Sequence, residues 1–133
     1  MNKSELDPLA ERVIGAAIEV HRCLGPGLLE SAYRAALCRE LALNEIPFEF
    51  EKALPIRYKD VLLDCGYRLD VVVAGQIVIE LKAIDALLPI HEAQLLSYLR
   101  LGGYSLGYLI NFHERLLKHG IKRFIITPSP CPP

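Results

Sequence analysis

The stretch 66–82, GYRLDVVVAGQIVIELK, consists of two apolar runs separated by a short Ala-Gly-Gln turn. Side chains alternate between the two faces of a β-strand, so this pattern predicts a hairpin of two antiparallel strands. Within the two runs stand Asp70, Glu80 and Lys82. Glu80 and Lys82 are two residues apart and therefore share one face of their strand.

The turn sets which residues face each other. If Val73 lies opposite Ile77, then Asp70 lies directly opposite Glu80 on the face that carries Lys82. The other face is apolar throughout and is predicted to be core: Leu69, Val71, Val73, Ile77, Ile79 and Leu81.

Two facing carboxylates repel each other and cost free energy in a half-buried strand pair unless a positive charge lies between them. A divalent cation such as Mg²⁺ or Mn²⁺ prefers oxygen ligands of this kind, and Lys82 would stand beside the attacking water of a hydrolysis. The pattern D-x9-E-x-K is short. From the hairpin alone, a solvated strand face without an ion is the favoured interpretation.

The chain has 133 residues, of which 52% are hydrophobic, and this length predicts a single domain, 1–133, with one generous core. The net charge of -1 provides no overall attraction to nucleic acid or to an anionic membrane. A polyanionic partner would have to be held locally. The proline-rich segment 127–133 is expected to be an irregular tail.

The cysteines form no Cys-x-x-Cys pair, so the sequence predicts neither a zinc site nor a disulfide framework. We expect reduced, mostly buried thiols and a cytoplasmic location. The N-terminus does not resemble a signal peptide, and no apolar run reaches the roughly 18 residues of a membrane span. No membrane association is expected.

Apolar spacing predicts an amphipathic helix over Leu9–Leu24, with Asp7 as its N-cap and Pro8 as its first residue. Gly25-Pro26-Gly27 ends this helix, because glycine suits a left-handed C-terminal residue and proline cannot continue the hydrogen-bond ladder. A second helix is predicted from Leu28 to about Asn44.

A long strand is predicted over Ile46–Tyr58, where Pro47 and Pro55 indicate a sheet edge or a bulge. Tyr104–Phe112 follows a helix and is therefore predicted to run parallel to its neighbour. The order α-α-β-β-β-α-β-α-β predicts an α/β (α+β) domain with a mixed sheet flanked by helices. The remaining elements are expected at Val61–Val73 (strand), Ile77–Ile84 (strand), Ile90–Leu101 after Pro89 (helix), Glu114–His119 (short helix) and Ile121–Thr127 (strand).

Three pieces together resemble the PD-(D/E)XK nuclease superfamily: Glu30 on an N-terminal helix, the hairpin with Asp70 and Glu80-x-Lys82, and Gln94-x-x-x-Tyr98 on the next helix. The Gln-x-x-x-Tyr helix resembles the RecB-like branch. The segment 27–33, GLLESAY, is similar to the motif that names the bacterial GxxExxY proteins. The residue before Asp70 is leucine, where the superfamily name has proline. The resemblance implies a restriction-endonuclease-like fold over nearly the whole chain.

The resemblance also implies roles for individual residues. It makes Asp70, Glu80 and the backbone carbonyl of Leu81 metal ligands, and adds Glu30 from the second helix. Lys82 would orient or activate the attacking water. Catalysis would also involve Gln94 and Tyr98, which would position the lysine or the phosphate.

Four further residues are candidates for substrate binding, each with a plainer alternative. His91 could contact the metal or the phosphate, although a helix-face histidine more often packs or faces solvent. Tyr33 is equally well explained as a core residue. Lys122 and Arg123 belong to a basic run that could meet a phosphate backbone, although a solvated surface run is the simpler interpretation.

The function implied is Mg²⁺- or Mn²⁺-dependent hydrolysis of phosphodiester bonds in nucleic acid, with DNA favoured over RNA. The competing interpretation is a catalytically silent, nuclease-like scaffold that binds nucleic acid or assembles with a partner. A third is a domain that holds no ion at all. Because the chain is short and weakly charged, a homodimer would extend its substrate surface.

Overall fold

The computed structural model describes residues 3–127, so the expected tail at 127–133 lies outside the described residues except for Thr127. The chain forms, in order, α1 (Lys3–Leu24), α2 (Glu30–Leu43), β1 (Phe48–Ala53), β2 (Ile56–Tyr58), β3 (Val61–Leu63), β4 (Arg68–Val73), β5 (Ile77–Lys82), α3 (Pro89–Gly102), β6 (Leu106–Asn111), the 3-10 helix η1 (Leu117–Gly120) and β7 (Ile121–Ile125).

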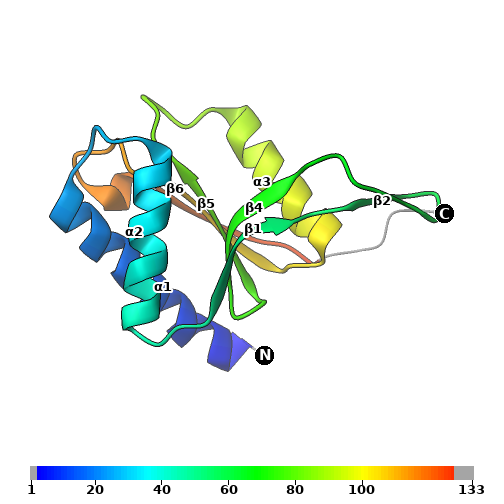
Figure 1. Ribbon diagram of the computed structural model, residues 1–133, viewed down its shortest axis with the longest axis horizontal. Helices are drawn as coiled ribbons and strands as arrows, with labels where there is room; N and C mark the ends of the chain where they lie inside the picture. Colours follow the sequence, from blue (N-terminus) through cyan, green and yellow to red (C-terminus); the bar gives the residue numbers. More distant parts are fainter. Residues whose placement is uncertain (1–2, 128–133) are drawn as a thin grey trace.

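A five-stranded mixed sheet in the order β1-β4-β5-β6-β7 forms the centre of the molecule (Figure 1). Strands β5 and β6 are parallel, and the other neighbours are antiparallel. Helix α3 connects the parallel pair, as the crossover rule requires. The predicted α/β class and the parallel strand after the third helix are therefore confirmed, and β1 is an edge strand as its prolines indicated.

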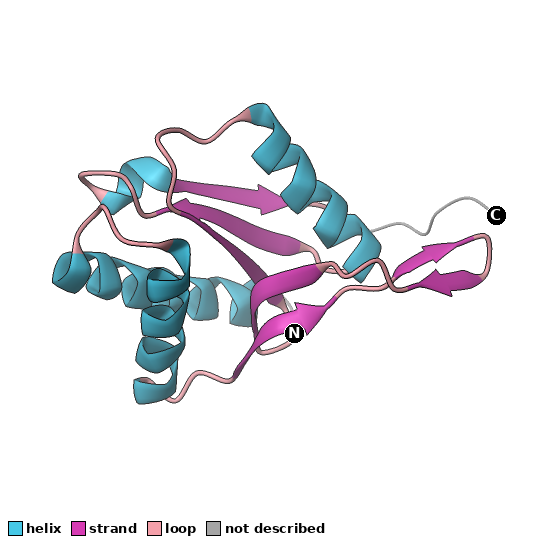
Figure 2. Cartoon of the chain, turned by 45° about the horizontal axis from the view of Figure 1, so that its top comes forward, coloured by secondary structure: helices cyan, strands magenta, loops and turns pink. Residues whose placement is uncertain are grey.

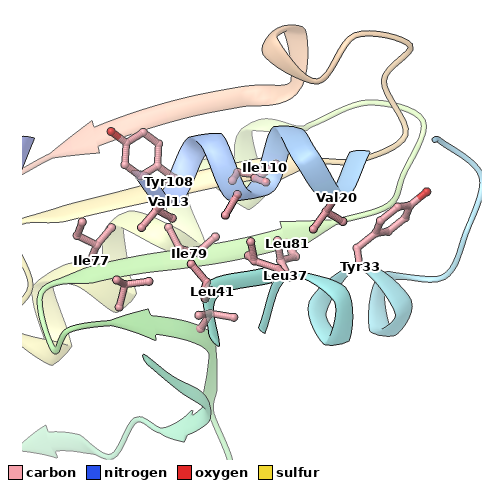
Figure 3. Packing of buried hydrophobic residues seen from close by; sticks show 14 of the residues in the cluster. Val13, Val20, Tyr33, Leu37, Leu41, Ile77, Ile79, Leu81, Tyr108 and Ile110 are labelled. Atoms are coloured by element: carbon pink, nitrogen blue, oxygen red, sulfur yellow. The ribbon is translucent and has the colours of Figure 1, made fainter. Parts of the chain in front are cut away.

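Helices cover both faces of the sheet, with α1 and α2 on one side and α3 on the other (Figure 1). The larger core lies between the sheet and the α1–α2 layer, where Val13 and Val20 of α1 and Leu37 of α2 meet Ile79 and Ile110 (Figure 3). A smaller core lies under α3 and includes Leu95 and Leu99. Among the described residues, no helix is both long and apolar enough to cross a bilayer.

The hairpin has the predicted register. Val73 pairs with Ile77 and Val71 with Ile79, so the same register brings Asp70 opposite Glu80. The predicted burial of Leu69 is confirmed, but the face to which it was assigned is wrong. Leu69 is buried but packs in the α3 cluster, not with Val71. The pairing on both sides of β4 is irregular at this point. Glu51 of β1 has a φ of 49° and is missing from the β1–β4 pairs, and the β4–β5 pairs end at Val71, so strict alternation of faces does not extend to Leu69.

Two predicted long strands are each broken. Pro55 separates β1 from β2, because proline has no N–H to continue a ladder. Residues 64–67 separate β3 from β4, and Gly66 adopts a φ of 79° there. The chain thus leaves the main sheet as a separate two-stranded hairpin, β2–β3, which projects from the body of the molecule (Figure 2).

The ends of two predicted helices also differ from the structure. Helix α1 starts at Lys3, so Asp7 is not its N-cap and Pro8 lies inside it. A proline near the N-terminus removes only one hydrogen bond of the ladder, which explains why the helix tolerates it. The predicted helix at Glu114–His119 is reduced to the 3-10 turn η1.

Candidate active site

Asp70 and Glu80 form the centre of the candidate site on neighbouring strands. The backbone N–H of Asp70 donates to Glu80 Oε1 over 3.1 Å, and the backbone N–H of Leu81 donates to Asp70 Oδ2 over 2.9 Å. Glu80 is only 8% exposed. Each carboxylate is therefore held by the other strand's backbone, which keeps the two acidic groups close together and largely out of water.

The close approach changes the acidity of Glu80. Burial and the charge of Asp70 raise the pKa of Glu80 from its ordinary value of 4.5 to about 8, although the nearby Lys82 ammonium favours the charged form. At neutral pH and without a cation, this raised pKa favours the protonated form of Glu80. Asp70, Glu80 and Lys82 meet here as the alternation of the hairpin predicted.

Glu30 approaches this pair from the first turn of α2. Burial and the charge of Asp70 raise the pKa of Glu30, while Lys82 and Arg34 oppose the shift. The four charges thus act on one another from three elements. Within the described chain, however, no three carboxylate, imidazole or thiol side chains converge closely enough to hold one ion together. Asp70 and Glu80 are consequently the inner pair, and Glu30 is a peripheral member.

Helix α3 contributes Tyr98 and Gln94 from one of its faces. Burial and the charge of Glu80 raise the pKa of Tyr98, and Tyr67 and Asp70 add to that shift. Gln94 stands one turn before Tyr98, and both side chains line a cavity of about 250 Å³. The helix therefore brings both predicted residues to the side of the sheet that carries Glu80.

Two charged residues that the sequence analysis did not single out also join the site. The Arg34 guanidinium lies 3.0 Å from Glu51 and 3.6 Å from Asp70, measured between nitrogen and oxygen atoms. Arg34 follows Glu30 by four residues on α2, so helical spacing alone could have found it. Glu51 has a φ of 49° within β1, a conformation that costs free energy in a non-glycine residue.

Tyr33 is placed in the core and not at the carboxylates. Its ring stacks on Phe112 with 4.6 Å between centroids, and the residue is fully buried. Its hydroxyl donates to the carbonyl of Gly25 over 2.5 Å and accepts the N–H of Leu28 over 3.1 Å. In Figure 3 this hydroxyl points away from the cluster of aliphatic side chains. The tyrosine of the GLLESAY segment therefore secures the loop between α1 and α2.

His91, Lys122 and Arg123 are each engaged elsewhere. The Nδ1 atom of His91 accepts the N–H of Leu88 over 2.9 Å at the start of α3. Lys122 and Arg123 are consecutive on β7 and point to opposite faces, where Lys122 pairs with Glu92 at 3.1 Å and Arg123 pairs with Asp7 at 3.0 Å.

Strand β6 lies between β7 and the β5 strand that carries Glu80. The structure therefore brings the charges of Glu30, Asp70, Glu80 and Lys82 together, with Tyr98 in electrostatic range and Gln94 beside Tyr98 in the cavity wall. It leaves these two basic residues outside. The cysteines were expected to be mostly buried. Cys23 and Cys65 are instead exposed free thiols, so this expectation is wrong for these two residues. Cys38 is partly buried, and Cys131 lies outside the described residues.

Comparison of the sequence with protein families supports the same assignment. The model of the PD-(D/E)XK nuclease superfamily matches residues 7–124. Comparisons with curated proteins and with solved structures found no match. The matched range extends from α1 to β7 and includes every charged residue of the candidate site. The chain therefore belongs to the PD-(D/E)XK nuclease superfamily.

Proposed function

We propose that this protein is a divalent-metal-dependent nuclease that hydrolyses phosphodiester bonds of nucleic acid. The observation that carries the proposal is the buried Asp70–Glu80 pair with Lys82 on the same strand as Glu80. Burying the Glu80 carboxyl group beside the charge of Asp70 costs free energy, and strongly shifted groups of this kind cluster at functional sites. Within the superfamily, we assign the chain to the GxxExxY group of the RecB-like branch on its GLLESAY and Gln-x-x-x-Tyr segments.

The donor set of the pair fits a hard cation. Asp70 and Glu80 supply carboxylate oxygens, which suit Mg²⁺ and Mn²⁺, and a cation would replace the proton that the raised pKa of Glu80 favours. We assign the backbone carbonyl of Leu81 as a further ligand and Glu30 as an outer contributor from α2. When bound, such an ion polarises the scissile phosphate and lowers the pKa of the attacking water.

The chain's own side chains have distinct roles in this proposal. The Lys82 ammonium orients the attacking water and offsets the negative charge that grows on the phosphate. Tyr98 and Gln94 donate hydrogen bonds from α3 to the phosphate or to the side chain that orients the water. Arg34 of α2 offsets the negative charge of Asp70 across 3.6 Å between nitrogen and oxygen.

The partners proposed are nucleic acid, with DNA favoured over RNA, and a second copy of the chain that extends a small substrate surface. The compartment proposed is the cytoplasm, because Cys23, Cys38 and Cys65 are free thiols. Among the described residues, Lys122 and Arg123 already have carboxylate partners on the protein. Their proposed contribution to substrate binding therefore requires those surface pairs to open.

The test is cleavage of labelled single- and double-stranded DNA and RNA with Mg²⁺, with Mn²⁺ and with EDTA. We expect metal-dependent cleavage by the parent protein and none by Lys82→Ala. Lys118→Ala is the matched control, because Lys118 is an exposed lysine on η1. Absence of cleavage by the parent on every substrate, or full cleavage by Lys82→Ala, would contradict the proposal.

One observation favours a second candidate, a catalytically silent scaffold that binds nucleic acid. Among the described residues, no three acidic, histidine or cysteine side chains converge on one ion position. A scaffold would bind an oligonucleotide with similar affinity in EDTA and in Mn²⁺ and would cut nothing. The same substrates in a binding assay therefore separate the two candidates.

A further inference from the structure

A cavity of about 250 Å³ opens between α3 and the segment that enters β4. Two tyrosines line it, Tyr98 of α3 and Tyr67, which precedes β4. The charges of Glu80 and Asp70 contribute to the raised pKa of Tyr98. The ring centroids of the two tyrosines are 5.9 Å apart, and their planes are tilted by 54°. Tyr98 therefore lies in the wall of the cavity and within electrostatic range of the carboxylate pair.

The lining is aromatic, aliphatic and neutral. Leu54 and other apolar side chains accompany the two tyrosines, and the hydrogen-bonding groups beyond the phenols are the Gln94 amide and the Ser97 hydroxyl. None of the residues that line the cavity carries a charge at neutral pH. A phosphate group requires positive charge or several aligned donors, whereas a planar neutral group requires a ring to stack on and a few polar groups at its edge. The lining fits the second kind of ligand.

We propose that this Tyr67–Tyr98 cavity binds one unpaired nucleobase of the strand whose phosphate lies at Glu80 and Lys82. The inference rests on the proposed nuclease function and adds the substrate class, which is single-stranded or locally unpaired nucleic acid. The base stacks on Tyr67, which is 43% exposed, and its edge meets Gln94 or Ser97. A base within a duplex has both faces covered by its neighbours and cannot enter.

The position of Tyr67 in the chain supports this role. Its backbone carbonyl accepts the N–H of Leu54 over 3.0 Å, which fixes the segment to the end of β1. Tyr67 stands three residues before Asp70, so the stacking surface and the first carboxylate belong to one continuous segment. A nucleotide held at Tyr67 would therefore have its backbone within reach of the acidic pair.

The test measures binding and stacking in the Lys82→Ala background, in which no substrate is consumed. The probes are a single-stranded DNA oligonucleotide, the RNA strand of the same sequence and the matching DNA duplex, each with 2-aminopurine at successive positions. We expect tighter binding of the single strands and quenching of 2-aminopurine at one position. Tyr67→Ala should weaken single-strand binding by about tenfold or more and remove the quenching, and Tyr67→Phe should retain both. Tyr58→Ala, a matched exposed tyrosine on β2 outside the cavity, should bind as the Lys82→Ala parent does.

Equal affinity for duplex and single strand, no quenching at any position, or parental binding by Tyr67→Ala would overturn the inference. The quenching in the Lys82→Ala protein itself does not depend on how the Tyr67 variants fold. Failure of the nuclease proposal has a different signature. If the wild-type chain cleaves nucleic acid and the cleavage does not depend on Tyr67, only the proposed base site is wrong. If a base stacks at Tyr67 but no metal condition gives cleavage, only the proposed hydrolysis is wrong.

Discussion

Asp70 and Glu80 hold each other's strands by reciprocal contacts: the N–H of Asp70 donates to Glu80 Oε1, and Asp70 Oδ2 accepts the N–H of Leu81, the residue after Glu80. The two carboxyl groups thus accept hydrogen bonds from backbone N–H groups of the neighbouring strand, in place of backbone carbonyl groups. This arrangement fixes two acidic groups at short range before any ligand arrives. Preorganised charge of this kind is what a metal or a transition state can use.

The acidity of Glu80 predicts how the metal-free protein responds to pH. Because the pKa of Glu80 is raised from 4.5 to about 8 in the folded state, this group favours folding fully below pH 4.5 and loses that contribution as the pH rises to 8. Each unit of pKa difference corresponds to about 1.4 kcal/mol. Urea unfolding in EDTA should therefore show a lower free energy of unfolding at pH 8 than at pH 5. Glu80→Gln should flatten this dependence, and a parent whose stability rises over the same range would contradict the raised pKa.

Asp70→Asn tests whether the carboxylates strain the metal-free protein. The change removes one charge from the pair, and the amide oxygen can still accept the Leu81 N–H. We expect the metal-free variant to be as stable as the parent or slightly more stable, and inactive. Mn²⁺ at a hundredfold excess over Kd should stabilise the parent by about 2.7 kcal/mol and the variant much less. A much lower melting temperature for Asp70→Asn, with no shift of the melting temperature by Mn²⁺ in either protein, would instead show that these carboxylates stabilise the fold and bind no metal.

Lys82→Ala separates metal binding from chemistry. An ammonium group repels a cation and cannot serve as its ligand, so the variant should bind Mn²⁺ at least as tightly as the parent while cleavage is lost. Calorimetric titration of Mn²⁺ measures the first property, and the labelled-oligonucleotide assay measures the second. Loss of Mn²⁺ binding in Lys82→Ala would show that the lysine has a different role.

Tyr33→Phe tests the structural role of the tyrosine in the GLLESAY segment. Phenylalanine keeps the stacking on Phe112 but leaves the Gly25 carbonyl and the Leu28 N–H without their partner. The free energy of unfolding should fall by about 1–3 kcal/mol, with cleavage unchanged at temperatures well below the melting point. A variant of parental stability that has lost nucleic-acid binding would restore Tyr33 to the substrate site.

Alternation of side chains was sufficient to predict the inner site. The register that brings Asp70 opposite Glu80 depends only on strand periodicity and on the turn length, and both are local in sequence. The same rule places Lys122 and Arg123 on opposite faces of β7, so their joint assignment to one surface conflicted with the strand predicted there. Local alternation was thus informative for the carboxylate pair and for β7, but it assigned Leu69 to the wrong face.

The parts that could not be predicted depend on distant contacts. Glu51 joins the site because β1 pairs with β4, which no local pattern reveals, and its φ of 49° has no signal in the residue type. The projecting β2–β3 hairpin forms because the chain leaves the main sheet after β1 and returns to it at β4. Strand propensity alone does not show these breaks, so it predicted one long strand in place of β1 and β2 and another in place of β3 and β4. The Tyr67–Tyr98 cavity likewise joins two elements that are 31 residues apart in the sequence.

The central claim is that the Asp70–Glu80 pair binds a divalent cation in exchange for the proton on Glu80, and calorimetric titration of Mn²⁺ in buffers of different ionisation enthalpy tests it most directly. At pH 7, which is below the pKa of about 8 for Glu80, binding should release about one proton per ion, and Asp70→Asn should bind far more weakly. At pH 9.5 the release should nearly vanish. No Mn²⁺ binding at either pH, or binding that Asp70→Asn leaves unchanged, would contradict the account.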